Sequence, residues 1–285
     1  MIMTDYLVNG KAGGLISVQD RGFQYGDGLF ETILVENGNA LFLSEHLDRL
    51  GYGCNVLGFP SIDRKLLERE VNEIVSNNQF GVLKIMLSRG ESERGFLIPD
   101  KPKITRVVTF SSSLKSHMGV KLQHVNITLC KTRLSQQPLL AGIKHLNQLE
   151  RVLARSEWKD TTVSEGLMLD SEGHVIEGTM SNVFVVKEGV IKTSDLNYAG
   201  VKGIMRDFIL KRATEQGYDC HVTNLTLDDV LNADEVFITN SLILLKTVAK
   251  LTFLNRTATY VEGPVSPIMY GAIWDEIVAR HGERS

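Results

Sequence analysis

The segment LLAGIKHLN, from Leu139 to Asn147, places one lysine directly after five apolar or small residues. The apolar spacing beyond it predicts a helix from about His145 to Trp158, with Lys144 at its start. We expect this lysine to be partly removed from water, which lowers the pKa of an ammonium group and frees the amine for Schiff-base chemistry. The alternative is a lysine whose charged end extends from the helix terminus into solvent. Spacing alone leaves both interpretations open.

A second segment, GHVIEGTMSN (Gly173 to Asn182), places Glu177 after a short apolar run and among small and polar residues. Such residues suit a tight backbone next to a ligand. A carboxylate at this position could hold a heteroaromatic nitrogen in its protonated form. An exposed glutamate in an ordinary turn is the alternative interpretation.

Three further sets of residues could bind anions. The segment VKGIMR (Val201 to Arg206) opens a predicted helix without a side-chain cap, so its first N–H groups and the positive end of the helix dipole suit an anion. Arg49 lies in a helical apolar pattern, where an arginine is usually a surface residue. Arg89 and Arg94 flank a short loop after a predicted strand. They could grip ligand carboxylates or pair with Glu91 and Glu93 between them.

The chain mixes strand and helix patterns without a regular alternation, which predicts an α+β fold. Asn9-Gly10 and Asn37-Gly38 each separate two apolar runs, a strong signal of a β-hairpin. Helical spacing runs from Ser44 to about Leu57, and Asp63 is expected to cap the next helix.

A Ser-rich stretch without periodicity predicts a boundary between two domains. We expect a smaller N-terminal α+β domain at 1–112 and a linker at 113–120. A larger C-terminal α+β domain at 121–285 would then contain Lys144.

Composition argues against several classes of function. A net charge of −3 does not favour a nucleic-acid partner, and the hydrophobic and charged contents of 43% and 23% are ordinary for a globular protein. The three cysteines, Cys54, Cys130 and Cys220, are widely spaced in the sequence. This sparse pattern indicates free thiols in a reducing compartment. With neither a signal-peptide pattern nor a long apolar run, we expect a cytoplasmic protein without a membrane partner. The histidines form no HxxxH or HExxH pattern, so no metal is expected.

Seven segments, in order along the chain, resemble the class IV aminotransferase family of pyridoxal-phosphate enzymes. They are SVQDRGFQYGDGLFET (Ser17 to Thr32), HLDRL (His46 to Leu50), LKIMLSRGESERGF (Leu83 to Phe96), AGIKHLNQLERVLAR (Ala141 to Arg155), LDSEGHVIEGTMSNVF (Leu169 to Phe184), AGVKGIMRDF (Ala199 to Phe208) and DEVFITNS (Asp234 to Ser241). The resemblance implies the two-domain α+β architecture of PLP-dependent fold type IV, shared with D-amino-acid and branched-chain aminotransferases, with the cofactor between the domains. Family members are commonly homodimers.

The resemblance also implies roles for individual residues. Lys144 would bind pyridoxal 5'-phosphate (PLP) through a Schiff base and then move protons, and Glu177 would pair with the pyridine nitrogen. The phosphate would be held by Arg49, by the backbone of Ile204 and Met205, and by Ser241.

Substrate contacts are implied at other positions. Tyr25 and Arg94 match positions that approach substrate in relatives, and either could come from a neighbouring subunit. Arg94, Arg89 or Arg21 could bind the carboxylates of an anionic substrate.

The residues after Lys144, HLNQLE, resemble the branch of the family that converts 4-amino-4-deoxychorismate to p-aminobenzoate and pyruvate, a carbon–oxygen lyase reaction of folate biosynthesis. Transamination of D-amino acids or branched-chain amino acids is the alternative. Leu149 stands about where branched-chain enzymes tend to carry an aromatic residue, and Phe96 stands where D-amino-acid enzymes tend to carry a histidine. Tyr25 is compatible with either branch. A non-catalytic binding protein of this fold would be expected to lack Lys144 or Glu177.

Overall fold

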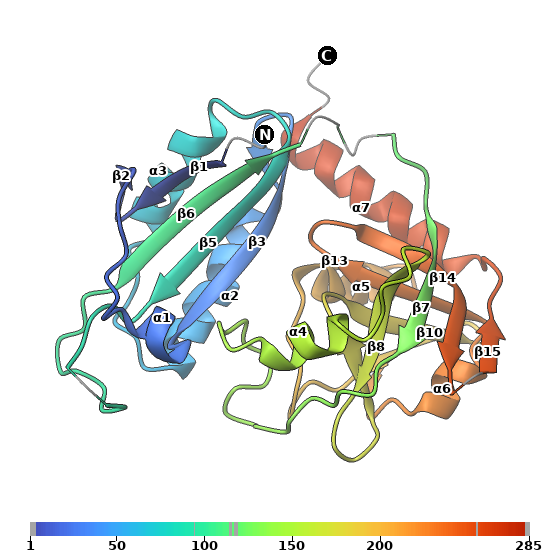
Figure 1. Ribbon diagram of the computed structural model, residues 1–285. Coiled ribbons are helices and arrows are strands. Elements are labelled where there is room, and N and C mark those ends of the chain that lie inside the picture. The colour runs from blue at the N-terminus through green and yellow to red at the C-terminus, as the bar shows by residue number, and fades with distance from the viewer. Residues whose placement is uncertain (1–3, 94, 114–115, 117–118, 255, 283–285) are drawn as a thin grey trace. The chain divides into compact units, whose positions relative to one another are not determined.

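The computed structural model describes residues 4–93, 95–113, 116, 119–254 and 256–282 (Figure 1). The chain forms two compact units. Unit 1 contains Met1–Gly119 and Ile143–Asn147, and unit 2 contains Val120–Gly142 and Gln148–Glu283. Part of the expected linker, at 114–115 and 117–118, lies outside the described residues, and its role as a linker stays a prediction.

Unit 1 is built on a six-stranded antiparallel sheet in the order β2-β1-β6-β5-β3-β4. Its strands are β1 (Thr4–Val8), β2 (Lys11–Ala12), β3 (Gly28–Glu36), β4 (Asn39–Ala40), β5 (Gly81–Ser88) and β6 (Thr105–Ser112). Both predicted hairpins are confirmed. Asn9 and Gly10 have φ of 52° and 75°, and Asn37 and Gly38 have φ of 50° and 70°, the positive values that a tight two-residue hairpin turn requires.

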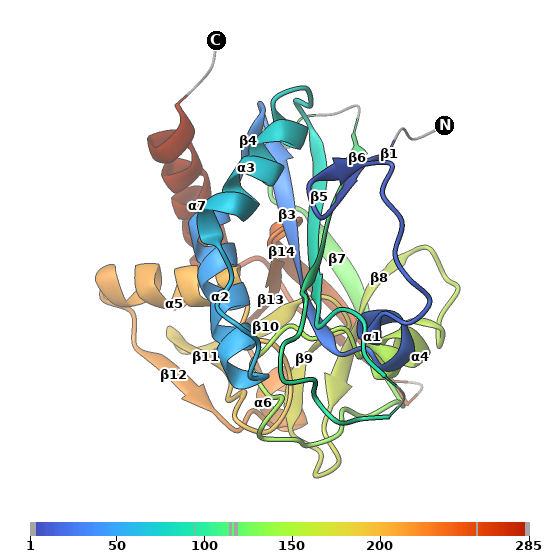
Figure 2. The ribbon, with the colours of Figure 1, turned by 90° about the vertical axis from the view of Figure 1, so that its left-hand side faces the viewer.

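Helices α2 (Leu43–Val56) and α3 (Arg64–Val75) cover one face of this sheet (Figure 2). Asp63 caps α3 as predicted, because its side chain accepts a hydrogen bond of 3.0 Å from the backbone N–H of Leu66. The sheet contributes the fully buried Ile33, Leu83 and Ile85 to the core of the unit.

The segment that carries Lys144 belongs to unit 1 through its hydrogen bonds to β3. The N–H of Phe30 donates to the carbonyl of Lys144 at 2.9 Å, and the N–H of Leu146 donates to the carbonyl of Gly28 at 2.9 Å. The predicted helix start at Lys144 is therefore wrong: α4 spans Leu149–Arg155 and begins only after this extended segment. Pairing with β3 outweighs the local helical pattern. The lysine was also expected in the C-terminal domain, whereas the contacts of its segment group it with unit 1.

Unit 2 contains a nine-stranded mixed sheet in the order β12-β11-β10-β13-β14-β7-β8-β9, with β15 paired to β14. The strands are β7 (His124–Leu129), β8 (Val163–Leu169), β9 (Val175–Gly178), β10 (Asn182–Lys187), β11 (Val190–Ser194), β12 (Cys220–Thr223), β13 (Glu235–Asn240), β14 (Leu244–Phe253) and β15 (Arg256–Thr259). Most pairs are antiparallel, while β7 runs parallel to both β8 and β14, and β11 runs parallel to β12.

Helices α5 (Ile204–Glu215) and α7 (Val265–His281) pack on β13, and α7 also packs on β14 (Figure 1). Helix α4 packs on β8, and the short α6 (Leu227–Leu231) begins with a capping box. Strands and helices thus follow one another irregularly, as the predicted α+β class requires. Among the described residues, no helix is both long and apolar enough to span a bilayer.

Candidate active site

Lys144 lies in unit 1 with its side chain half-buried, and its Nζ sits 4.3 Å from the centre of the Phe30 ring. Phe30 and Lys144 are also joined by a backbone hydrogen bond, so strand β3 fixes both the backbone and the direction of the lysine. An amine held against an aromatic face loses part of its hydration on that side. The structure therefore places this lysine in a defined position, without the helix expected there.

A buried charged cluster lies beside this lysine within unit 1. Glu31 accepts hydrogen bonds from Nε of Arg49 at 2.9 Å and from Nδ1 of His46 at 2.6 Å, and a second Arg49 nitrogen also donates to it. Glu31 comes from β3, while His46 and Arg49 lie three residues apart on α2, so the strand and the helix are joined through one carboxylate. The Glu31 carboxylate thus orients Arg49. The side chain of Arg49 is 11% exposed, whereas its helical pattern suggested a surface residue.

Burial and charge set the ionisation of this cluster. Burial alone raises the pKa of Glu31, but the charge of Arg49 and the hydrogen bonds from His46 and Arg49 outweigh it and lower this pKa to about 2. Burial lowers the pKa of His46, and the nearby charges of Arg49 and Lys144 also lower it. The hydrogen bond to Glu31 and the charge of Glu31 act in the opposite direction, and the net shift is downward. We infer that His46 is neutral and donates from Nδ1. Its Nε2 has no hydrogen-bond partner among the described residues.

Glu177 lies on β9 of unit 2 and is buried, with 3% of its surface exposed. Its Oε2 accepts hydrogen bonds from Nδ2 of Asn182 at 3.2 Å and from the N–H of Val201 at 3.0 Å. Its Oε1 forms an ion pair with Nη2 of Arg151 on α4. The alternative of an exposed turn glutamate is therefore wrong.

Gly200 permits the contact between Val201 and Glu177. Its φ is +88°, and a Cβ at this position would lie 2.8 Å from side-chain atoms of both Ile176 and Leu196. Only glycine combines this backbone conformation with so close an approach to the strand that carries Glu177.

The turn after Glu177 is held by a second buried carboxylate, that of Glu165 on β8. Glu165 accepts hydrogen bonds from the N–H of Thr179 at 3.0 Å, the N–H of Met180 at 3.2 Å and the hydroxyl of Ser181 at 2.8 Å. These donors are neutral groups. Their hydrogen bonds to the carboxylate take the place of the strand-to-strand hydrogen bonds that the backbone lacks in this turn. The turn is thereby fixed relative to Glu177.

The predicted anion site at the start of α5 has the expected local features. Gly203 precedes the helix without a side-chain cap, and a Cβ there would lie 2.0 Å from Oδ1 of Asn182. Ile204 and Met205 are buried at the first turn. Because Asn182 also donates to the carbonyl of Val201 at 2.9 Å, the start of α5 and Glu177 are tied to one amide side chain.

Ser241 lies in the turn between β13 and β14, half-buried. Asn240 shapes this turn: its Oδ1 accepts hydrogen bonds from the N–H groups of Leu242 and Ile243, each at 2.8 Å. Its Nδ2 donates to the carbonyl of Met180 at 3.0 Å, which links the turn to the segment after Glu177.

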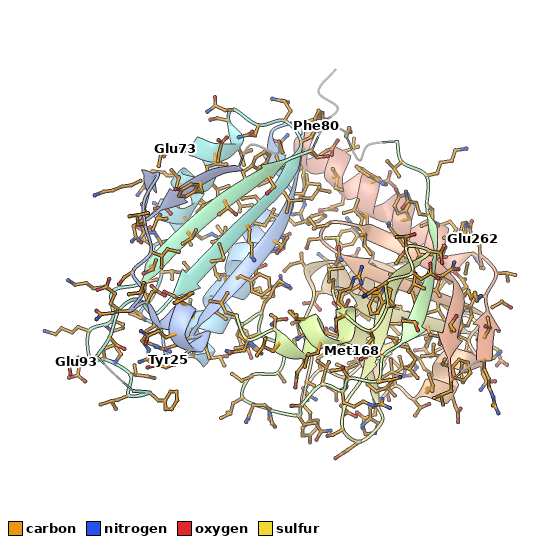
Figure 3. The ribbon with its side chains drawn as sticks, in the orientation of Figure 1. Tyr25, Glu73, Phe80, Glu93, Met168 and Glu262 are labelled. Atoms are coloured by element: carbon orange, nitrogen blue, oxygen red, sulfur yellow. The ribbon has the colours of Figure 1, made fainter. Side chains whose placement is uncertain are left out.

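The predicted substrate contacts lie in or near the loop after β5 of unit 1. Tyr25 ends the short helix α1 (Arg21–Tyr25), packs against Phe96 with ring centres 5.2 Å apart, and accepts a hydrogen bond from the N–H of Gly95 at 3.4 Å (Figure 3). Arg21 donates to the carbonyls of Gly95, Phe96 and Leu97 and so holds the loop in place. Arg94 lies outside the described residues.

Arg89 has partners other than those expected for it. Its Nε donates to Asp27 at 2.8 Å, its Nη2 donates to the carbonyl of Leu57 at 2.8 Å, and its guanidinium carbon lies 4.2 Å from the centre of the Phe59 ring. Only 2% of Arg89 is exposed. The structure thus gives Arg89 a role inside the fold through Asp27, in place of a pairing with Glu91 or Glu93. Its contact with a ligand carboxylate stays a prediction.

Sequence reasoning missed three contributors to these clusters. Glu31 and His46 were not singled out, although His46, Arg49 and Leu50 share one helical face, a pattern that could have indicated a buried histidine. Arg151 was also missed, since its partner Glu177 is distant in the sequence and no local pattern joins them.

Residues 28–251 match the model of the family described as "Amino-transferase class IV". An aminodeoxychorismate lyase from Vibrio harveyi is 35% identical over 265 residues, which cover 92% of this chain and 96% of the relative. A D-alanine aminotransferase from Bacillus licheniformis is 31% identical over 231 residues, 79% of each chain. The crystal structure of a 4-amino-4-deoxychorismate lyase from Pseudomonas aeruginosa superposes with a TM-score of 0.84 at 36% identity, covering 97% of this chain and 99% of the other. The chain belongs to the class IV aminotransferase family.

Proposed function

We propose that this protein is a PLP-dependent lyase that converts 4-amino-4-deoxychorismate to p-aminobenzoate and pyruvate. The observation that carries the proposal is the similarity to a lyase of that name at 35% identity over more than nine-tenths of both chains. The retained Lys144 and the buried Glu177, with donors arranged around its carboxylate, give it a chemical basis.

The residues present fit PLP by their chemistry. The cofactor's aldehyde calls for an amine, which Lys144 offers. Its pyridine nitrogen calls for a buried anion, which Glu177 provides at 3% exposure. Its phosphate calls for N–H donors and positive charge, and the uncapped start of α5 at Gly203 is suited to this. Arg49 and Ser241 complete the proposed phosphate contacts.

When bound, PLP supplies an electron sink for the bond changes at the substrate. Lys144 is the proposed proton carrier: its Nζ takes the proton from C4 of the substrate and then returns a proton to the departing enolpyruvyl group, which leaves as pyruvate. Loss of this group makes the ring aromatic, which drives the reaction forward. Glu177 holds a positive charge at the pyridine nitrogen, and the two donors on its Oε2 keep its carboxylate oriented.

The substrate is anionic, so positive and hydrogen-bonding groups are proposed to bind it. We retain Tyr25 and Arg94 as proposed substrate contacts. Arg89 is a weaker candidate because its guanidinium already donates to Asp27, Leu57 and Gly58. Substrate binding by Arg89 would require breaking contacts that are almost completely shielded from water.

Transamination of D-amino acids is the second candidate, favoured by the 31% identity to a D-alanine aminotransferase. Transamination needs the same lysine and glutamate, so neither residue separates the two reactions. Branched-chain amino acids are the other substrates to test.

We also propose a homodimer. A hollow of about 410 Å³ in unit 1 is lined mainly by apolar side chains, among them Ile16, Val18, Phe23, Met86 and Val107. Val18 and Phe23 are 76% and 77% exposed in the single chain. Exposed apolar groups gathered in one place are typical of a protein interface.

Cytoplasmic location is proposed from the cysteines. All three are free thiols, as expected in a reducing compartment. Burial raises the pKa of Cys54 to about 11 and that of Cys130 to about 12, so both remain protonated and unreactive at neutral pH.

The test mixes the PLP-loaded protein with 4-amino-4-deoxychorismate and follows p-aminobenzoate and pyruvate, with Lys144→Ala as the control. Equal amounts of both products, formed only when Lys144 is present, are expected. The same preparations are assayed with D-alanine or leucine and 2-oxoglutarate. Amino transfer without p-aminobenzoate would replace the lyase by the transaminase.

A further inference from the structure

Arg151 pairs with Glu177, the carboxylate that the proposed chemistry assigns to the pyridine nitrogen of PLP. It stands on α4, its side chain is 14% exposed, and its Nη2 contacts Oε1 of Glu177. A buried carboxylate is costly unless a counter-ion and hydrogen bonds compensate its charge. In the cofactor-free protein, Arg151 supplies that counter-ion.

The two oxygens of Glu177 are not equivalent. Oε2 already accepts two hydrogen bonds, from Asn182 and from the N–H of Val201. A carboxylate oxygen has about two acceptor sites, so Oε2 is saturated. A further donor must therefore come to Oε1, where Arg151 is bound.

We infer that Arg151 and the pyridine nitrogen of PLP are alternative counter-ions of Glu177, and that Arg151 gives way when the cofactor binds. The inference rests on the proposed function and extends it to Arg151, a residue to which the resemblance assigned no role. Two cations on one carboxylate oxygen repel each other, whereas either alone neutralises the buried charge. Arg151 is thus a positioning residue that stabilises the cofactor-free protein at the expense of cofactor affinity.

This competition has a specific signature. Neutralising Arg151 strengthens binding of PLP, because the ring nitrogen no longer displaces a cation. The same change does not strengthen binding of the PLP analogue in which C–H replaces the ring nitrogen. That analogue keeps the aldehyde and the phosphate but cannot donate to Glu177.

The experiment measures dissociation constants of PLP and of this carbon analogue for the cofactor-free protein by equilibrium ultrafiltration. Arg151→Gln removes the charge and keeps an amide donor, while Arg151→Lys keeps the charge. Arg155→Gln is the matched control, because Arg155 lies one turn further along α4 and donates to the carbonyl of Trp158 instead.

We expect Arg151→Gln to lower the ratio of the PLP constant to the analogue constant about tenfold, which corresponds to about 1.4 kcal/mol. Arg151→Lys and Arg155→Gln should leave the ratio unchanged. Equal effects of Arg151→Gln on both ligands would overturn the inference and leave the proposed function standing. Failure of the unmodified protein to bind PLP would overturn the proposed function itself.

A second measurement needs no variant, in case Arg151→Gln does not fold. Crystal structures of the unmodified protein with and without PLP should show Nη2 of Arg151 within about 4 Å of Oε1 of Glu177 only in the cofactor-free form. An unbroken pair beside a ring nitrogen bound to Glu177 would refute the exchange.

Discussion

Replacing Glu31 by glutamine tests how far unit 1 depends on its buried charged cluster. The pKa of Glu31 falls from an ordinary value of 4.5 to about 2, because the Arg49 charge and the hydrogen bonds from His46 and Arg49 overcome the effect of burial. One pKa unit corresponds to about 1.4 kcal/mol. The ionised carboxylate therefore contributes about 3 kcal/mol to the free energy of unfolding at neutral pH.

The sign of the pH dependence follows from the direction of the shift. A carboxylate with a lowered pKa in the folded state stabilises the protein above its ordinary pKa, and this stability is lost as the pH falls from about 4.5 towards 2. In Glu31→Gln the cost at pH 7 should be about 3–5 kcal/mol, because Arg49 stays buried without its anion. Near pH 2 the variant and the unmodified protein should differ much less.

Urea unfolding of the cofactor-free protein at about pH 7 and pH 3 measures this difference, followed by far-UV circular dichroism. Tryptophan fluorescence is unsuitable alone, because Trp158 and Trp274 both belong to unit 2. Glu68→Gln is the control, since Glu68 pairs with Arg64 at the surface and should cost less than about 1 kcal/mol. An equal loss at both pH values for Glu31→Gln would refute the reasoning.

Three further changes give separate tests. Lys144→Ala should lower the rate of p-aminobenzoate formation by at least about 10²-fold while leaving the urea midpoint near that of the unmodified protein, because the amine carries the proton and β3 holds the backbone; a rate within tenfold would remove it from the reaction. Gly200→Ala should cost roughly 1–3 kcal/mol in urea unfolding, since φ is +88° and the new Cβ meets two side chains; a loss below about 0.5 kcal/mol would contradict the stated contacts. Phe23→Asp should shift sedimentation from dimer towards monomer, whereas Tyr52→Asp, on α2 and also exposed, should not; an unchanged dimer would exclude the proposed interface.

Local signals predicted much of the fold. Asn9-Gly10 and Asp63 succeeded because a turn or a cap depends on a few neighbouring residues whose backbone preferences are strong. The helix expected from His145 failed because the segment around Lys144 pairs with β3, a contact that spans more than a hundred residues of sequence. Long-range pairing of this kind leaves no periodic trace in the segment itself.

The candidate site was predictable in its motifs and not in its electrostatics. Glu177 was identified from the small residues around it, but its pairing with Arg151 depends on how α4 packs on β8. Arg89 shows the same limit: its loop position suggested a ligand contact or a pairing with Glu91 and Glu93, and in the structure its guanidinium donates to Asp27 and two carbonyls. Charge partners are chosen by tertiary structure, so sequence neighbours such as Glu91 and Glu93 are a poor guide to them.

The Glu165 carboxylate has a consequence for hydrogen exchange. Turns usually exchange their amide protons quickly, because few of their hydrogen bonds are shielded from water. Here the amides of Thr179 and Met180 both donate to one carboxylate that is 4% exposed. Their protons should therefore exchange as slowly as those of the neighbouring strands. The turn at 179–181 then behaves as part of the rigid core although it contains no regular secondary structure.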